Sequence, residues 1–287
     1  MFQPSAEIIA DSINPWGTRL TTFLLTYPRF IHAEMLRHRV FSRSVSSSRA
    51  IPIAKMIRIV EEAELYPSFW GAAQKGMAAD QEVNEETKLK AIAIWDEHRK
   101  ATLKATQALA DIGLHKQIPN RLLEPFAPVT ELVSSTDYQN FFELRDHPAS
   151  QPEIQAIAKL MRKAYAENKP KEMEVGQWHI PFIDPVKDKG LDCNHVLKAA
   201  VGRCARLSYL TQKGDRDPRE DVALCNKLWA DKHLSPFEHV ARVAPQHTHN
   251  DNFFEFASFR HELRVGALKY EDDGMFTEEK IKAGKTW

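Results

Sequence analysis

The sequence predicts an α+β fold in which an antiparallel sheet is flanked by helices. Three observations support this prediction. A chain of 287 residues can bury one sizeable core. The segment RLTTFLLTY, residues 19–27, is rich in the β-branched and aromatic side chains that favour strands. Other segments repeat apolar side chains at helical spacing, as residues 152–167 do. We expect a single domain over residues 1–287.

The first predicted strand leads directly into a helix. Pro28 suits the first turn of a helix because its φ angle is already fixed near the helical value. The segment PRFIHAEMLRHR then predicts a helix over residues 28–39, with residues 37–39 at its C-terminal end. We expect the serine-rich run that follows to be a loop.

The middle of the chain is expected to be mostly helical over residues 53–112. Residues 85–110 are rich in Ala, Leu, Lys and Glu, and Gly113 is a plausible stop. Because no site motif falls there, we interpret residues 53–120 as a helical addition to the domain. Residues 121–136 contain two prolines, and they predict a loop followed by a short helix.

Residues 152–263 predict three more helices and a pair of strands. A helix begins at Pro152, GRCARLSYL indicates a helix that ends in a turn, and a further helix is expected over residues 219–231. HLSPFEHVARVAP then enters a strand, and FFEFASFRHEL is expected to be its antiparallel partner. The polar residues 268–287 are candidates for a mobile tail.

Composition excludes several classes of function. The formal net charge is zero, so there is no general attraction to nucleic acid or to an anionic membrane. Three scattered cysteines do not form a disulfide framework or a metal motif, which favours reduced thiols and a cytoplasmic location. No signal peptide or membrane-spanning run is expected. His247 and His249 lack the further ligands that a metal site needs.

The most informative segment is RHRVFSRSVSSSR, which runs from Arg37 to Arg49. It combines four arginines and a histidine with several serines and has no acidic residue. Guanidinium groups bind phosphate through paired, charge-assisted hydrogen bonds, and hydroxyl groups complete such a site. A solvated basic loop is the alternative interpretation. Ser47 is not expected to be a nucleophile, because nothing in the sequence specifies a neighbouring base.

The spacing within this segment resembles the Arg-His-Arg-x7-Ser signature of the flavin-dependent thymidylate synthases. Three other segments are similar to that family: FFELRDHPASQPEIQ, HLSPFEH and CARLSY. In the family, the segments that resemble CARLSY and HLSPFEH come first, and the Arg-His-Arg and Leu-Arg segments follow them. In this chain the Arg-His-Arg and Leu-Arg segments come first. We therefore expect a circular permutation of the same fold, with an extra helical segment, cut between SPFEHVARV and RLTTFLLTY. Residues 235–245 should then lie beside residues 19–27.

The resemblance implies an enzyme, a methyltransferase that uses FAD, NADPH and 5,10-methylenetetrahydrofolate. It would add a one-carbon unit to C5 of a pyrimidine deoxynucleotide, dUMP to dTMP first, as a cytoplasmic homotetramer with sites at subunit contacts. Arg145 is implied in catalysis and in binding substrate, and His239 in contact with the flavin. The implied substrate-binding residues are Arg37, Ser47, Ser48, Arg49 and Arg145, and the implied cofactor-binding residues are His38, Arg39, Val40, Ser44, Ser208, Glu238 and His239.

The chain departs from the family pattern at several positions near this site. Ser44 and Val45 stand where the family usually has Asn-Glu, Ala50 stands in place of Tyr, and Glu34 in place of Gln. These departures leave open the same chemistry on dCMP, or a hydroxymethyl product. A nucleic-acid-binding protein and a member that has lost catalysis remain alternatives from other classes. Ordinary salt bridges of some of the arginines to Glu34, Glu143, Asp146 or Glu153 are the structural alternative.

Overall fold

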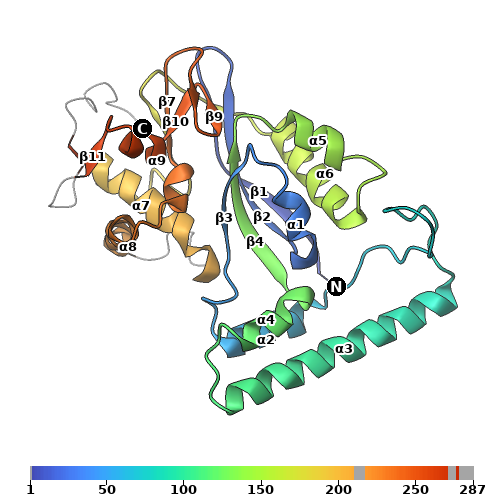
Figure 1. Cartoon of the computed structure of the whole chain (residues 1–287). Coiled ribbons are helices and arrows are strands. Elements are labelled where there is room, and N and C mark those ends of the chain that lie inside the picture. Colours follow the sequence, from blue (N-terminus) through green and yellow to red (C-terminus); the bar gives the residue numbers. More distant parts are fainter. Residues whose placement is uncertain (1, 210–216, 271–275, 278–287) are drawn as a thin grey trace.

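A five-stranded sheet forms the centre of the computed structural model (Figure 1), which describes residues 2–209, 217–270 and 276–277. The strand order is β3-β4-β2-β1-β5. The first four strands pair antiparallel, and β5 runs parallel to β1. Helices flank the sheet, so the predicted α+β fold is confirmed. The strands are β1 (Ser5–Ile13), β2 (Arg19–Pro28), β3 (Ser42–Val45), β4 (Pro128–Ser135) and β5 (Lys171–Glu172).

One face of the sheet packs against helices α5 (Gln139–Arg145) and α6 (Pro152–Glu167) (Figure 1). Side chains alternate along a strand, so Phe23, Leu25 and Tyr27 of β2 all point to this face. They share a hydrophobic cluster with residues of α6, where the predicted helical spacing buries its apolar side chains. The predictions of the strand and of this helix are both confirmed.

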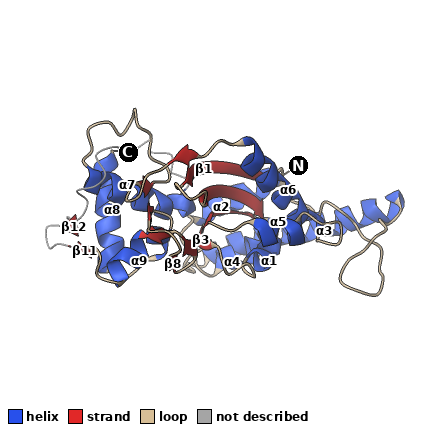
Figure 2. Ribbon diagram, turned by 90° about the horizontal axis from the view of Figure 1, so that it is seen from above, coloured by secondary structure: helices blue, strands red, loops and turns tan. Residues whose placement is uncertain are grey.

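The opposite face carries the C-terminal half, by which we mean the described residues from Met173 onward. Figure 2 shows its helices on the other side of the strands from α3. A three-stranded sheet of order β10-β7-β6 lies there together with several helical segments. Its elements are β6 (Trp178–His179), β7 (Ala241–Val243), β10 (Phe256–Ser258), α7 (Cys193–Ala205), α8 (Pro218–Ala230), the 3-10 helix η4 (Ser235–Glu238) and α9 (Phe259–Arg264). The predicted antiparallel pairing is confirmed for β7 and β10, but residues 259–264 form α9 instead of continuing the strand.

The helical addition lies across one end of the central sheet (Figure 1). It comprises α2 (Ile53–Ala63), α3 (Glu85–Asp111) and α4 (Pro119–Leu123). The side chain of Asn84 accepts a hydrogen bond from the backbone N–H of Thr87, which satisfies a donor that would otherwise have no partner at the start of α3. The long helix is therefore found where it was predicted. Between α2 and α3 the chain is not helical and forms one isolated bridge, Gly71 to Glu82.

Three local predictions are wrong. Residues 128–135 form the strand β4 and not a helix, because apolar residues at positions 129, 132 and 133 fit both periodicities in so short a run. Ser42–Val45 is a strand and not a loop, since pairing with β4 supplies its backbone hydrogen bonds. The helix predicted over residues 28–39 is shorter, with a 3-10 turn η1 (Arg29–Ile31) followed by α1 (His32–Met35).

The remaining elements are short. They are the 3-10 helices η2 (Glu124–Phe126) and η3 (Arg206–Tyr209), and the strands β8 (His249–Asn250), β9 (Phe253–Phe254), β11 (Lys269–Tyr270) and β12 (Phe276–Thr277). Most of the segment named above as a candidate tail, residues 271–275 and 278–287, lies outside the described residues. Within the described part, no helix is both long and apolar enough to cross a bilayer.

Candidate active site

Strand β3 divides the sequence-predicted site residues into two groups, because successive side chains point to opposite faces of the sheet. Ser44 faces the C-terminal half, where its hydroxyl lies 3.0 Å from Nε2 of His239. Arg43 faces the other way, and its guanidinium donates hydrogen bonds to the carbonyl oxygens of Met35 and His38 at 2.8 and 3.1 Å. Arg43 therefore holds the turn that carries Arg-His-Arg.

The first group is centred on His38 and Arg145. Nε of Arg145 donates a hydrogen bond to Nε2 of His38 over 3.0 Å, although the two residues are far apart in the sequence. The rings of Phe41 and Phe141 enclose the imidazole. Burial, and then the positive charges of Arg145 and Arg43, lower the pKa of His38 to about 4. The imidazole is neutral at pH 7, so it acts as an acceptor that orients Arg145.

The arginines of this group are not consumed by ordinary salt bridges. Two nearby acids have other contacts: Asp146 pairs with Arg162, and Glu153 accepts hydrogen bonds from Ser68. Within the described ranges, none of the four arginines predicted to bind phosphate forms an ion pair. They are Arg37, Arg39, Arg49 and Arg145. Three of them, at positions 37, 39 and 49, are exposed, so their charge is available to an anionic ligand.

The second group surrounds a cavity of about 300 Å³. Most of its lining comes from three segments that are far apart in the sequence, and Leu228 of α8 adds to it. Residues 43–45 come from β3, Cys204, Ala205 and Leu207 from the end of α7 and from η3, and His233, Ser235 and Pro236 from η4 and the turn before it. These are the serine-rich, CARLSY and HLSPFEH segments. The fold thus brings together three of the segments that carry the resemblance to the family.

Two of the predicted serines make contacts inside the chain. The backbone N–H of Ser47 donates a hydrogen bond to Oγ of Ser208 at 2.8 Å, which ties the serine-rich segment to η3. Ser48 is buried, and its hydroxyl donates to Glu124. Ser47 is exposed, whereas the hydroxyl of Ser48 already donates a hydrogen bond within the chain. Val40 is exposed beside the Arg-His-Arg turn.

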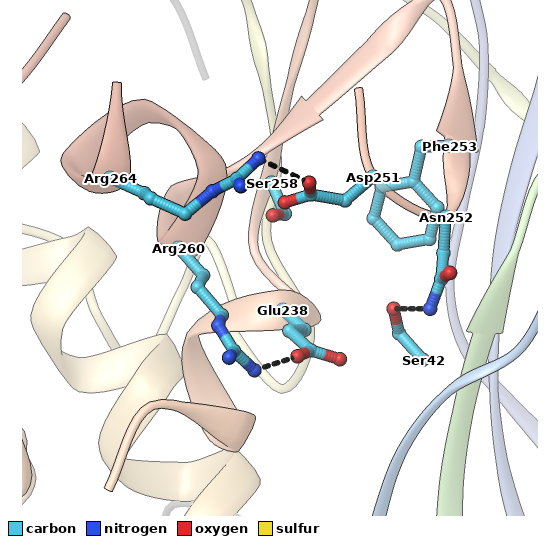
Figure 3. A pocket seen from close by; sticks show the side chains of 8 residues that line it. All are labelled: Ser42, Glu238, Asp251, Asn252, Phe253, Ser258, Arg260 and Arg264. Carbon is cyan, nitrogen blue, oxygen red and sulfur yellow. Dashed lines mark hydrogen bonds and ion pairs between the residues drawn. The ribbon is translucent and has the colours of Figure 1, made fainter. Parts of the chain in front are cut away.

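A second cavity of about 240 Å³ lies on the other side of η4 and contains Glu238. Figure 3 shows that Arg260 reaches Glu238 and that Arg264 reaches Asp251. The amide of Asn252 donates to the hydroxyl of Ser42 at 3.3 Å. Glu238 is thus neutralised by a neighbouring arginine. Its predicted role in binding the cofactor stays a prediction.

His239 is enclosed completely, with no exposed surface. Its two ring nitrogens lie within hydrogen-bonding distance of two serine hydroxyls, Ser134 at 2.9 Å and Ser44 at 3.0 Å. Burial, and then the neighbouring His179, lower the pKa of His239 to about 3, so the ring is neutral. The chain itself therefore covers the ring, and Ser44 is its connection to the cavity. Contact with flavin stays a prediction.

The neighbours of β7 bear on the expected circular permutation. Strand β7 pairs with β10 and β6, whereas β2 pairs with β1 and β4, so the two segments do not join in one sheet. They do share side-chain packing, since Leu20 lies in one hydrophobic cluster with Ala241 and Val243. Residues 235–245 and 19–27 are thus neighbours through their side chains. The permutation itself stays a prediction.

Comparison with known proteins identifies the family. The profile of the family described as thymidylate synthase complementing protein matches residues 15–171, more than half of the chain. The chain belongs to this family. The flavin-dependent thymidylate synthase of Pseudothermotoga lettingae is 26% identical over 148 residues, which cover 50% of this chain and 61% of that protein. The match therefore spans less than two thirds of the curated relative.

Two solved structures, a nucleotide methylase and a flavin-dependent thymidylate synthase, are partly similar to this chain. A UMP/dUMP methylase, PolB from Streptomyces cacaoi bound with 5-Br UMP, is 16% identical with a TM-score of 0.47, covering 58% of this chain and 90% of that one. A flavin-dependent thymidylate synthase from Helicobacter pylori, complexed with FAD and dUMP, is 19% identical with a TM-score of 0.34, covering 51% and 67%.

Sequence reasoning missed several residues around the site of this family member. Arg43 lies within the recognised segment, and its position between two serines was the available signal. Thr22, Ser134 and His179 carry no motif. For Ser134 the signal was hidden because its strand was interpreted as a loop and a helix. Among the described residues, no group of three or more His, Cys, Asp or Glu side chains is arranged to hold a metal ion.

Proposed function

We propose that this protein is an FAD-dependent enzyme that transfers a one-carbon unit from 5,10-methylenetetrahydrofolate to C5 of a pyrimidine deoxynucleotide and reduces it. Conversion of dUMP to dTMP is the leading reaction. The observation that carries the proposal is the convergence of three family-like segments on the cavity beside Ser44. Membership of the family and the name of the curated relative support it.

The arginines of the Arg-His-Arg turn supply the positive charge that a nucleotide phosphate needs. Arg37, Arg39 and Arg49 are exposed and unpaired within the described chain, so they lose no internal ion pair when they bind an anion. A charge-assisted hydrogen bond contributes about 1.5–3 kcal/mol. Arg145 is partly buried and oriented by His38, which makes it the best candidate for a contact close to the reacting base.

The residues around the two cavities fit part of a flavin. Hydroxyl groups of Ser44 and Ser235 and the imidazole of His233 line the larger cavity, and they suit phosphate, ribose or carbonyl oxygens. Reduced FAD would supply the hydride that completes the methyl group, and NADPH would reduce FAD again. The larger cavity, about 300 Å³, is at the lower limit for small-molecule sites, so it holds only part of a dinucleotide.

The division of site residues between two faces supports a site shared between subunits. His38 and Arg145 lie on the α5 side of β3, and Ser44 and Ser208 lie toward the C-terminal half. We infer that a homotetramer, as in the resemblance, brings the arginines of one copy to the cavity of another. Sedimentation of the purified protein checks this, and a monomer that turns over substrate would contradict it.

A second candidate function keeps the chemistry and changes the base or the product. Val45 offers no acceptor where the family usually has a carboxylate. Its cross-strand partner is Glu131, whose carboxylate is buried and accepts a hydrogen bond from Tyr27 at 2.5 Å. This carboxylate is buried, and one of its oxygens is already engaged, so it does not replace the missing acceptor; this favours a changed base contact such as cytosine, or a hydroxymethyl product.

The test is the visible spectrum of the purified protein, followed by anaerobic NADPH with dUMP or dCMP. We expect flavin bands at roughly 370 and 450 nm, with bleaching that depends on one of the two nucleotides. Bleaching with dCMP alone would select the second candidate. A colourless protein that takes up no added FAD would contradict both and would favour a member without catalysis.

A further inference from the structure

Six buried polar side chains form one continuous hydrogen-bonded chain across the central sheet. Four of them are hydroxyl groups from β1, β2, β4 and β3. The other two are histidines of the C-terminal half, which lie between the hydroxyl groups. The successive distances are 2.8, 2.8, 2.6, 2.9 and 3.0 Å. No member is more than 9% exposed. In order, the members are Ser12, His179, Thr22, Ser134, His239 and Ser44.

Strand register explains why these groups meet. Thr22 and Ser134 are direct cross-strand partners in the β2–β4 ladder, so their side chains point to the same face. Ser44 pairs with Leu132, which is two residues from Ser134 and shares its face. The histidines reach this face from β6 and from the residue after η4. Burial lowers the pKa of both rings to about 3, so each carries one ring proton at pH 7.

Counting protons leaves two consistent directions for the chain. Each hydroxyl donates one hydrogen, and each neutral imidazole has one N–H and one acceptor nitrogen. In the first direction every bond is donated from Ser12 toward Ser44, and both histidines carry the proton on Nε2. In the second direction every bond is donated from Ser44 toward Ser12, and both carry it on Nδ1. Unlike tautomers break the chain at its centre: one combination leaves a buried hydroxyl hydrogen without an acceptor, and the other leaves no hydrogen between the oxygens of Thr22 and Ser134.

The two ends of this hydrogen-bonded chain, Ser12 and Ser44, select the first direction. In the second, the hydroxyl hydrogen of Ser12 would need another acceptor. Ser12 is 4% exposed, and its side chain makes no other hydrogen bond in the part of the chain that the structure describes. A buried donor without a partner is unfavourable. In the first direction the outermost hydrogen belongs to Ser44, which lines the larger cavity, so a ligand can accept it.

We propose that Thr22 and His179 are positioning residues that hold His239 in its Nε2–H form and so make Ser44 a fixed hydrogen-bond donor to a ligand oxygen in the cavity. His239 donates to Oγ of Ser44, and the Ser44 hydroxyl hydrogen points outward. The matching ligand atom is an acceptor, a phosphate or carbonyl oxygen. That this ligand is the nucleotide or the flavin rests on the proposed function, but the direction of the chain does not.

The first experiment measures the histidine tautomers directly. Long-range ¹H–¹⁵N correlation spectra of the ¹⁵N-histidine-labelled full chain separate Nδ1–H from Nε2–H. We expect His179 and His239 both in the Nε2–H form at pH 7, without any ligand. Assignments come from the spectra of His179→Gln and His239→Gln. The Nδ1–H form at either residue would overturn the proposal, whatever the enzyme activity proves to be.

The second experiment interrupts the hydrogen-bonded chain at its centre and compares that variant with a matched control. Thr22→Val removes the central hydroxyl. Thr21→Val removes an equally buried hydroxyl of the same strand, which donates to Asp11 at 2.8 Å on the opposite face. Thermal unfolding of both variants verifies that they fold. Titration with dUMP in the presence of FAD then measures ligand affinity.

We expect Ser44→Ala to weaken dUMP or FAD binding about ten-fold, as for one hydrogen bond to a charged group. Thr22→Val should weaken it about two- to five-fold, and Thr21→Val should not change it. The double variant of Thr22 and Ser44 should bind no more weakly than Ser44→Ala alone. Additive losses, or equal losses in the two threonine variants, would overturn the proposal. If the wild type binds neither ligand, the proposed function fails, and the tautomers still decide the direction of the chain.

Discussion

At the residue scale, the hydrogen bond between Arg145 and His38 makes a testable link between α5 and the Arg-His-Arg turn. Arg145 is the second-largest cause of the lowered His38 pKa, after burial. We expect Arg145→Ala to raise the pKa of His38 above about 4 while leaving it below the usual 6.5, because burial remains. NMR titration of the imidazole measures this. The exposed Arg162→Ala is the control, and an unchanged pKa in Arg145→Ala would contradict the coupling.

Residue motifs located the arginine-rich turn from the sequence because the whole motif lies within thirteen consecutive positions. The hydrogen-bonded chain behind Ser44 was not predictable in the same way. Thr22 and Ser134 become neighbours only through strand register, and His179 joins them from beyond the region matched by the family. A single histidine between Trp and Ile carries no sequence pattern. Long-range partners of this kind need the fold.

At the scale of elements, β3 shows how tertiary context overrides local preference. Ser and Arg do not favour strands, yet Ser42–Val45 pairs with β4 along its whole length. The same pairing explains why two predictions failed together. Once residues 128–135 are interpreted as a helix, the serine-rich run has no strand to join. Long helices such as α6 were predicted correctly because their periodicity repeats over several turns.

Helices α7 and α8 are held at a separation that only glycine permits. A Cβ on Gly202 would lie 2.3 Å from the backbone oxygen of Asp221. The side chain of that aspartate is also fixed, by a buried ion pair with Arg203 at 3.0 Å. Neither atom can move away cheaply. The close approach brings the end of α7 and the start of η3 to the larger cavity.

We therefore expect Gly202→Ala to destabilise the protein by about 1–3 kcal/mol, the usual cost of overpacking. Urea unfolding, followed by circular dichroism, measures the free energy of unfolding. Because α7 leads to Cys204 and Leu207 of the cavity wall, ligand affinity should fall as well. An unchanged unfolding midpoint would mean that α8 can shift without loss, and it would contradict the importance of this contact.

At the scale of the whole molecule, the fold keeps several buried or half-buried histidines neutral. The pKa is lowered to about 4 in His32 and His38 and to about 3 in His179 and His239, with burial as the largest cause in each. They lie on both faces of the central sheet. Burial of Glu131 acts oppositely and raises its pKa to about 7. These groups together make the stability of the whole chain depend on pH.

The direction follows from the protons bound by each state. As pH falls below 6.5, the unfolded chain protonates these histidines and the folded chain does not, so folding stability falls until pH 3–4. Glu131 binds its proton in the folded state between pH 7 and 4.5, so acidification over this range stabilises the fold through this group. One such group offsets the destabilising effect of only one of the four histidines. We expect the melting temperature to drop steadily from pH 7 to pH 4.5. His38→Gln should reduce that slope, and the exposed His98→Gln should not. A melting temperature that rises on acidification would mean that Glu131 dominates.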